Sequence, residues 1–89
     1  MTSRELQVNR SGRYFMFFEG GFTRNADLEN RRGLIDDLVQ PVGGKVCGAY
    51  VSPEAKGVGV IEIRYPGDPR DLVPALSTWG GNLSSSPVY

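Results

Sequence analysis

Residues 43–65 read GGKVCGAYVSPEAKGVGVIEIRY, a pattern typical of a β-hairpin. Two runs rich in β-forming residues, Lys45–Val51 and Val58–Tyr65, flank the turn-forming segment Ser52–Gly57. Pro53 fixes φ in that segment and Gly57 permits a positive φ, so the chain can reverse direction there. We therefore predict two antiparallel strands in the middle of the chain.

A further strand is predicted upstream of the hairpin, at Arg13–Glu19, where the sequence is RYFMFFE. Its length and aromatic content favour a strand over a helix. Side chains alternate between the two faces of a strand, which gives two apolar sets here: Tyr14, Met16 and Phe18 on one face, Phe15 and Phe17 on the other. Helices on one side of a sheet cover only one face. We expect a second copy of the chain to cover the other face, so the predicted partner is the chain itself, in a homodimer.

A first helix is predicted between this strand and the hairpin. Apolar residues recur there at helical spacing, and the helix is expected to run from about Asp27 to Val39. Thr23 or Asn25 can act as its N-cap, and Pro41 prevents regular helix from continuing.

A second helix is predicted after the hairpin, ending at Gly80-Gly81. Asp68 or Asp71 can cap its start, and a cap at Asp71 places Pro74 inside the first turn, where proline is tolerated. A weak strand is expected at Leu83–Tyr89, where Pro87 confines it to an edge or an end of the sheet.

The order of elements is strand, helix, strand, strand, helix, strand. This order is typical of the ferredoxin-like βαββαβ fold of the α+β class, a four-stranded antiparallel sheet with two helices on one face. The first and third strands are expected to be central. Residues 13–89 would form this single domain, and the polar residues 1–12 are expected to be a flexible N-terminal arm.

The composition argues against several classes of function. Ten basic and ten acidic residues give a formal charge of zero, unlike a protein held on nucleic acid by its overall field. With no histidine and the single cysteine Cys47, the chain lacks the usual catalytic triads and zinc ligands, so we expect no metal and no cofactor. The lone cysteine and the absence of a long apolar run or apolar leader indicate a cytoplasmic protein with no membrane span.

The segment GGKVCGAY, residues 43–50, resembles the GYD-domain family of small bacterial and archaeal proteins. The similarity extends over residues 13–89, with Ile63–Asp68 at the family's acidic turn and Trp79–Asn82 at the end of its second helix. Where the family has Gly-Tyr-Asp, this chain has Gly57-Val58-Gly59. The resemblance implies a dimeric α+β barrel, in which two ferredoxin-like sheets pack face to face. Enzymes of the wider superfamily often use histidine as acid, base or haem ligand, and this chain has none.

A second resemblance is to the RNA-recognition motif, which has the same order of strands and helices. Residues 56–63, KGVGVIEI, are similar to the third-strand signature of that family in their lysine and glycines. The positions that would stack on bases are aliphatic in this chain: Val58, Val60 and Ile63. We therefore expect nucleic acid to bind weakly or not at all.

Candidate site residues lie on or beside the predicted strands. Glu62 is the candidate catalytic residue, because a carboxyl group in mid-strand among apolar neighbours could act as an acid or a base. The alternative interpretation is a carboxylate that is exposed or paired with Arg64 on the same face. The candidate ligand-binding residues are aromatic or basic: Tyr14, Phe15, Phe17, Tyr50, Arg64 and Trp79.

Three classes of function fit these observations. The first is a small dimeric barrel that binds, and in one version transforms, an apolar or aromatic small molecule. The second is a non-catalytic interaction or assembly module, and the third is a degenerate RNA-binding domain. A ligand-sized cavity would distinguish the first from the second, and an aromatic sheet face open to solvent would favour the third.

Overall fold

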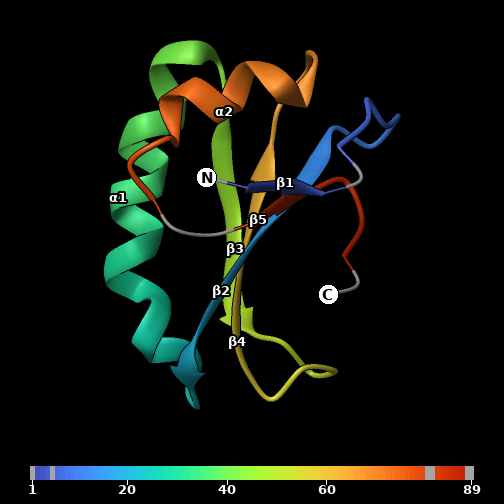
Figure 1. Ribbon diagram of the computed structural model, residues 1–89. Helices are drawn as coiled ribbons and strands as arrows, with labels where there is room; N and C mark the ends of the chain where they lie inside the picture. Colours follow the sequence, from blue (N-terminus) through green and yellow to red (C-terminus); the bar gives the residue numbers. More distant parts are fainter. Residues whose placement is uncertain (1, 5, 80–81, 88–89) are drawn as a thin grey trace.

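The computed structural model describes residues 2–4, 6–79 and 82–87. The elements follow in this order: β1 (Thr2–Arg4), β2 (Arg13–Phe22), the 3-10 helix η1 (Asn25–Leu28), α1 (Glu29–Val39), the 3-10 helix η2 (Gln40–Val42), β3 (Lys45–Val51), β4 (Gly57–Arg64), the 3-10 helix η3 (Pro69–Asp71), α2 (Leu72–Ala75) and β5 (Asn82–Ser84). Figure 1 shows α1 along one side of the sheet and α2 across its upper end.

The strands form one sheet in the order β1-β5-β2-β4-β3. β2 pairs antiparallel with both β4 and β5, and β3 pairs antiparallel with β4. These four strands with two helices have the predicted ferredoxin-like arrangement, and β2 and β4 are central as expected. The predicted hairpin is confirmed, with its first strand at Lys45–Val51 and its second at Gly57–Arg64.

The N-terminal segment differs from the expected flexible arm. Residues Thr2–Arg4 form β1, which pairs in parallel with β5 and extends the sheet. Further along, the backbone N–H of Gln7 donates to Ser85 Oγ at 3.1 Å, and Asn9 Nδ2 donates to the carbonyl of Arg13 at 2.8 Å. An edge strand has unpaired backbone groups. Three residues of the segment pair with β5 along its outer edge. Sequence periodicity alone does not reveal this pairing.

The first helix is preceded by a 3-10 turn. Regular α1 begins at Glu29, after η1, and ends at Val39 as predicted. Asn25, an expected N-cap, instead accepts a hydrogen bond through its Oδ1 from the backbone N–H of Val51 at 2.9 Å. The side chain therefore ties the start of the helical segment to the end of β3.

The second helix is shorter than predicted, because α2 ends at Ala75. The side chain of Asp68 caps η3 by accepting from the backbone N–H of Arg70, whereas Asp71 accepts a hydrogen bond from the Tyr65 hydroxyl at 3.1 Å. The two aspartates considered as caps thus have different roles. The final strand is also shorter than expected, and residues 80–81 and 88–89 of the predicted elements lie outside the described part of the chain.

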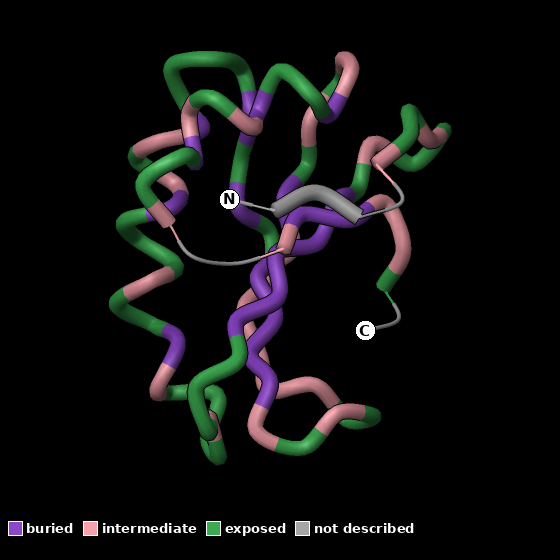
Figure 2. Tube along the Cα trace, in the orientation of Figure 1, coloured by how far each residue is buried: buried purple, intermediate pink, exposed green. Residues whose placement is uncertain are grey.

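The main core lies between the sheet and the helices. It contains the predicted inner set of β2 together with apolar side chains from the other antiparallel strands and from the two helical segments: Tyr14, Met16, Phe18, Ile35, Val39, Val46, Ile61, Ile63, Leu72, Leu76 and Leu83. In Figure 2 these buried positions follow the central strands and recur along α1. Because α1 and α2 contribute to the same cluster, both helices cover the same face of the sheet.

The opposite face of the sheet has its own apolar cluster, formed by Phe15, Phe17, Val58 and Val60. We call this surface the helix-free face. Its two aromatic side chains are nevertheless covered within one chain, with Phe15 7% and Phe17 1% exposed. Tyr50 and Ala55 pack against the cluster, so the loop between β3 and β4 contributes to the cover.

Replacing Phe17 tests whether this second cluster stabilises the fold. Phe17→Ala should lower the free energy of unfolding by about 3–5 kcal/mol, because it leaves a cavity in a buried site. Leu34→Ala is a matched control on α1, where the side chain is 44% exposed, and should change it by about 0.5 kcal/mol or less. Urea unfolding measures both. Equal midpoints for the two variants would contradict a packed helix-free face.

The homodimer stays a prediction. One chain already buries Phe15 and Phe17. The surface left for a second copy to cover is therefore the rim of the helix-free face, which includes the half-buried Tyr50. We expect light scattering at micromolar concentration to give twice the chain mass of 9.7 kDa. A mass of 9.7 kDa would show that the cover provided by the chain itself is sufficient.

Candidate functional site

Strand register brings three basic residues together at one end of the helix-free face. Arg64 is opposite Arg13 on β2 and opposite Lys45 on β3. The neighbours of these residues, Tyr14, Ile63 and Val46, point into the main core. Because side chains alternate along a strand, Arg13, Arg64 and Lys45 share the other face, and we call them the cation row.

The charges of the cation row are compensated only in part. Arg13 Nε lies 3.4 Å from Glu62 Oε1, and the Glu62 side chain is 18% exposed. Within the part of the chain that the structure describes, the side chains of Lys45 and Arg64 form no hydrogen bond or ion pair. Like charges directly opposite on adjacent strands repel each other. Lys45 and Arg64 are therefore two neighbouring cations whose mutual repulsion an anion between them would relieve.

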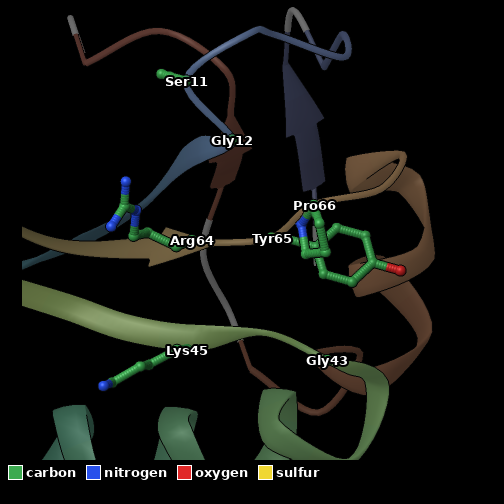
Figure 3. Close-up of a pocket in the computed structure, with 7 residues that line it drawn as sticks. All are labelled: Ser11, Gly12, Gly43, Lys45, Arg64, Tyr65 and Pro66. Carbon is green, nitrogen blue, oxygen red and sulfur yellow. The ribbon is translucent and has the colours of Figure 1, made fainter.

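A pocket of about 290 Å³ adjoins these two residues. Its described lining consists of Ser11, Gly12, Gly43, Lys45, Arg64, Tyr65 and Pro66. Figure 3 shows Lys45 and Arg64 extending from neighbouring strands toward the same side, while Tyr65 and Pro66 lie on the other. The pocket thus combines two cations with an apolar wall.

The wall formed by Tyr65 is held in place at both ends. Its hydroxyl donates to Asp71 Oδ2 at 3.1 Å, and its backbone N–H donates to the carbonyl of Gly12 at 2.8 Å. Gly12 has a φ of +67°, and a Cβ at this position would lie 3.0 Å from the carbonyl oxygen of Tyr65. Glycine is required here both for the left-handed turn and for the close approach of the two chain segments.

The predicted ligand-binding residues do not form one site. Arg64 lines the pocket, while Phe15, Phe17 and Tyr50 share its face of the sheet without lining it. The other two residues, Tyr14 and Trp79, lie on the helix side of the sheet. Tyr14 is fully buried, and its hydroxyl accepts a hydrogen bond from the backbone N–H of Asn9 at 3.2 Å. Trp79 packs against the main core.

Sequence reasoning missed Ser11, Lys45 and Tyr65 as pocket residues. The pairing of Lys45 with Arg64 would have identified Lys45, but that pairing requires the register of the hairpin. The register shifts between Val46 and Gly48, where an extra residue interrupts the regular ladder. Ser11 reaches the pocket only because the segment before β2 folds against Tyr65.

Glu62 lies on the same face as Arg64, but its ion-pair partner is Arg13. The expected pairing with Arg64 is therefore corrected: Arg13, a diagonal neighbour on β2, supplies the cation. Its proposed role as acid or base remains a prediction.

Two other titratable groups near Glu62 are held in their protonated forms. Burial raises the pKa of the Cys47 thiol, and the Glu62 charge raises it further, against the opposing effect of Arg13 and Arg64. The thiol also donates to the backbone carbonyl of Glu62 at 3.5 Å. Burial, followed by the Glu62 charge, likewise raises the pKa of Tyr50. At neutral pH neither group is an activated nucleophile or a base.

No group of three or more histidine, cysteine, aspartate or glutamate side chains that could hold a metal ion occurs among the described residues. Within that same part of the chain, no helix is both long enough and apolar enough to cross a membrane.

Comparisons with family models, curated proteins and solved structures yield no match for this chain. The resemblance to the GYD-domain family therefore stays a prediction based on residues 43–50.

The reactivity of Cys47 tests the electrostatics of this face. The thiol is exposed, yet its raised pKa should make alkylation by iodoacetamide slower than that of a free cysteine at the same mildly alkaline pH. Glu62→Gln removes a charge that favours the protonated thiol, so alkylation should become faster. Arg64→Met removes an opposing charge, so alkylation should become slower. The same change of rate in both variants would contradict this assignment.

Proposed function

We propose that this domain binds a small organic anion with a flat or apolar body in the pocket beside Lys45 and Arg64. The observation that supports the proposal most directly is the meeting of two unpaired cations, opposite each other in the described sheet, at the edge of a pocket of about 290 Å³. An anion there would relieve their mutual repulsion and accept hydrogen bonds from both.

The wall of the pocket indicates the rest of the ligand. The Tyr65 ring is fixed by its hydrogen bond to Asp71, and Pro66 adjoins it, so a planar ring or a short aliphatic body could pack there without ordering a mobile side chain. Ligand pockets commonly have volumes of about 300–1,000 Å³. A pocket of about 290 Å³ suits a ligand near the lower end of that range, such as a single ring with a carboxylate or a phosphate.

Binding without catalysis agrees best with the groups present. The described lining of the pocket offers two cations, a serine hydroxyl and a phenol, but no carboxylate. The protonated states of Cys47 and Tyr50 remove the nearest alternatives for a nucleophile or base at neutral pH. The lining therefore suits holding an anion better than transferring a proton from it.

RNA binding has less support. Stacking on bases requires open aromatic faces, and the two aromatic side chains of the helix-free cluster are 7% and 1% exposed.

We place the domain in the cytoplasm, where an exposed single thiol such as Cys47 stays reduced.

The proposal can be tested with benzoate and phenyl phosphate as probes, and with inorganic phosphate as a probe without the apolar body. In amide NMR titrations, both aromatic anions should shift the signals of Gly12, Gly43 and Lys45, and inorganic phosphate should bind more weakly. Lys45→Met and Arg64→Met should each weaken binding roughly fivefold, as expected for an exposed charge pair, and added salt should weaken it further.

Lys56→Met is the matched control, because Lys56 is an exposed lysine in the loop at the far end of the same hairpin. It should leave the affinity unchanged. Equal affinities for all three variants, or shifts distributed away from the pocket, would refute the proposed site.

A further inference from the structure

Arg31 of α1 lies among three aromatic rings on the helix side of the sheet. Its guanidinium carbon Cζ is 5.5 Å from the ring centroid of Phe18, 5.0 Å from that of Phe22 and 5.8 Å from that of Trp79. Phe18 and Phe22 belong to β2, and Trp79 belongs to the segment that follows α2 and descends beside α1 in Figure 1. We call the three rings the aromatic cage.

The rings form walls in different planes. Phe18 and Trp79 are 6.1 Å apart between centroids and meet edge to face at an interplanar angle of 81°. Phe22 provides the wall closest to Arg31. A Cβ on Gly59 would lie 2.6 Å from Leu28 Cδ2 and 3.1 Å from Phe22 Cδ2, so glycine at this position leaves room for the third ring.

Arg31 is held in the cage by the ring faces. Among the residues that the structure describes, its side chain has no ion pair or hydrogen bond, and its Nε is buried without a hydrogen-bond partner. A buried N–H with no acceptor is unfavourable and rare in folded proteins. Moving the guanidinium into water would supply the acceptor that Nε lacks, at the cost of its contacts with the three ring faces.

We propose that the aromatic cage is a binding site for an N-methylated ammonium group, and that Arg31 occupies it as an internal competitor. Several aromatic faces around one cation are the arrangement that recognises quaternary ammonium ligands, whose methyl groups need no hydrogen-bond acceptor. Such a ligand satisfies the cage without leaving an N–H unpaired. Arg31 is half-buried on a surface helix, so its long side chain can move into solvent and be hydrated there.

Tetramethylammonium chloride is the probe for this site, with sodium chloride at the same ionic strength as the reference. Trp79 is the single tryptophan of the chain, so its fluorescence reports on the cage directly. Ring currents should also shift the methyl signal of bound tetramethylammonium upfield in proton NMR. Arg31→Ala should bind the probe saturably and at least about tenfold more tightly than the unmodified protein, because the internal competitor is gone.

Arg32→Ala is the matched control, since Arg32 is the next residue on α1 and is exposed. Its affinity for tetramethylammonium should equal that of the unmodified protein. Absence of saturable binding to folded Arg31→Ala, or equal affinity in the two alanine variants, would overturn the proposal.

If Arg31→Ala does not fold, the unmodified protein decides the matter. Saturation with tetramethylammonium should move the Nε–H resonance of Arg31 toward its value in a solvated arginine as the Trp79 fluorescence changes. An Arg31 signal that does not respond at any probe concentration would show that the guanidinium is a permanent part of the core and that the cage binds no external cation.

Discussion

The antiparallel pairing of β2 with β4 determines both faces of the sheet at once. Its register runs from Arg13 opposite Arg64 at one end to Phe22 opposite Gly57 at the other. A slip of one residue would exchange the two faces of either strand. It would move Tyr14 or Ile63 out of the main core and bring a cation in, at the cost of burying a charge. The register that forms the core therefore also forms the cation row.

The same strand connects the two proposed sites. At its first residue, β2 contributes Arg13, which forms an ion pair with the Glu62 carboxylate. Lys45 and Arg64 are left without a described anionic partner. Near its end, it contributes Phe18 and Phe22 to the opposite face, where they surround Arg31. The cation row and the aromatic cage lie on opposite faces and near opposite ends of this strand. They share no residue, so binding at one can be measured separately from binding at the other.

The features that could be predicted from sequence are those that depend on local pattern. The hairpin has period-two alternation and a Pro/Gly turn, and α1 has helical spacing, so their bounds agree closely with the structure. The features that were missed depend on contacts between distant segments. β1 exists through its pairing with β5, and the cluster that contains Phe17 is packed on by Tyr50 and Ala55 of the same chain. Arg31 belongs to the polar set of the α1 pattern, and only the three-dimensional position of the rings shows that its charge lies among them.

Net charge is a poor guide to the electrostatics of this chain. Ten positive and ten negative side chains cancel in the total, and that balance argues against a field extending over the whole molecule. At physiological ionic strength, however, charges are screened beyond about 8 Å. A small ligand in the pocket would interact mainly with the nearest groups, Lys45 and Arg64, and a ligand in the cage mainly with the faces of three rings. A neutral protein can thus have a local preference for an anion on one face of its sheet and for a cation on the other.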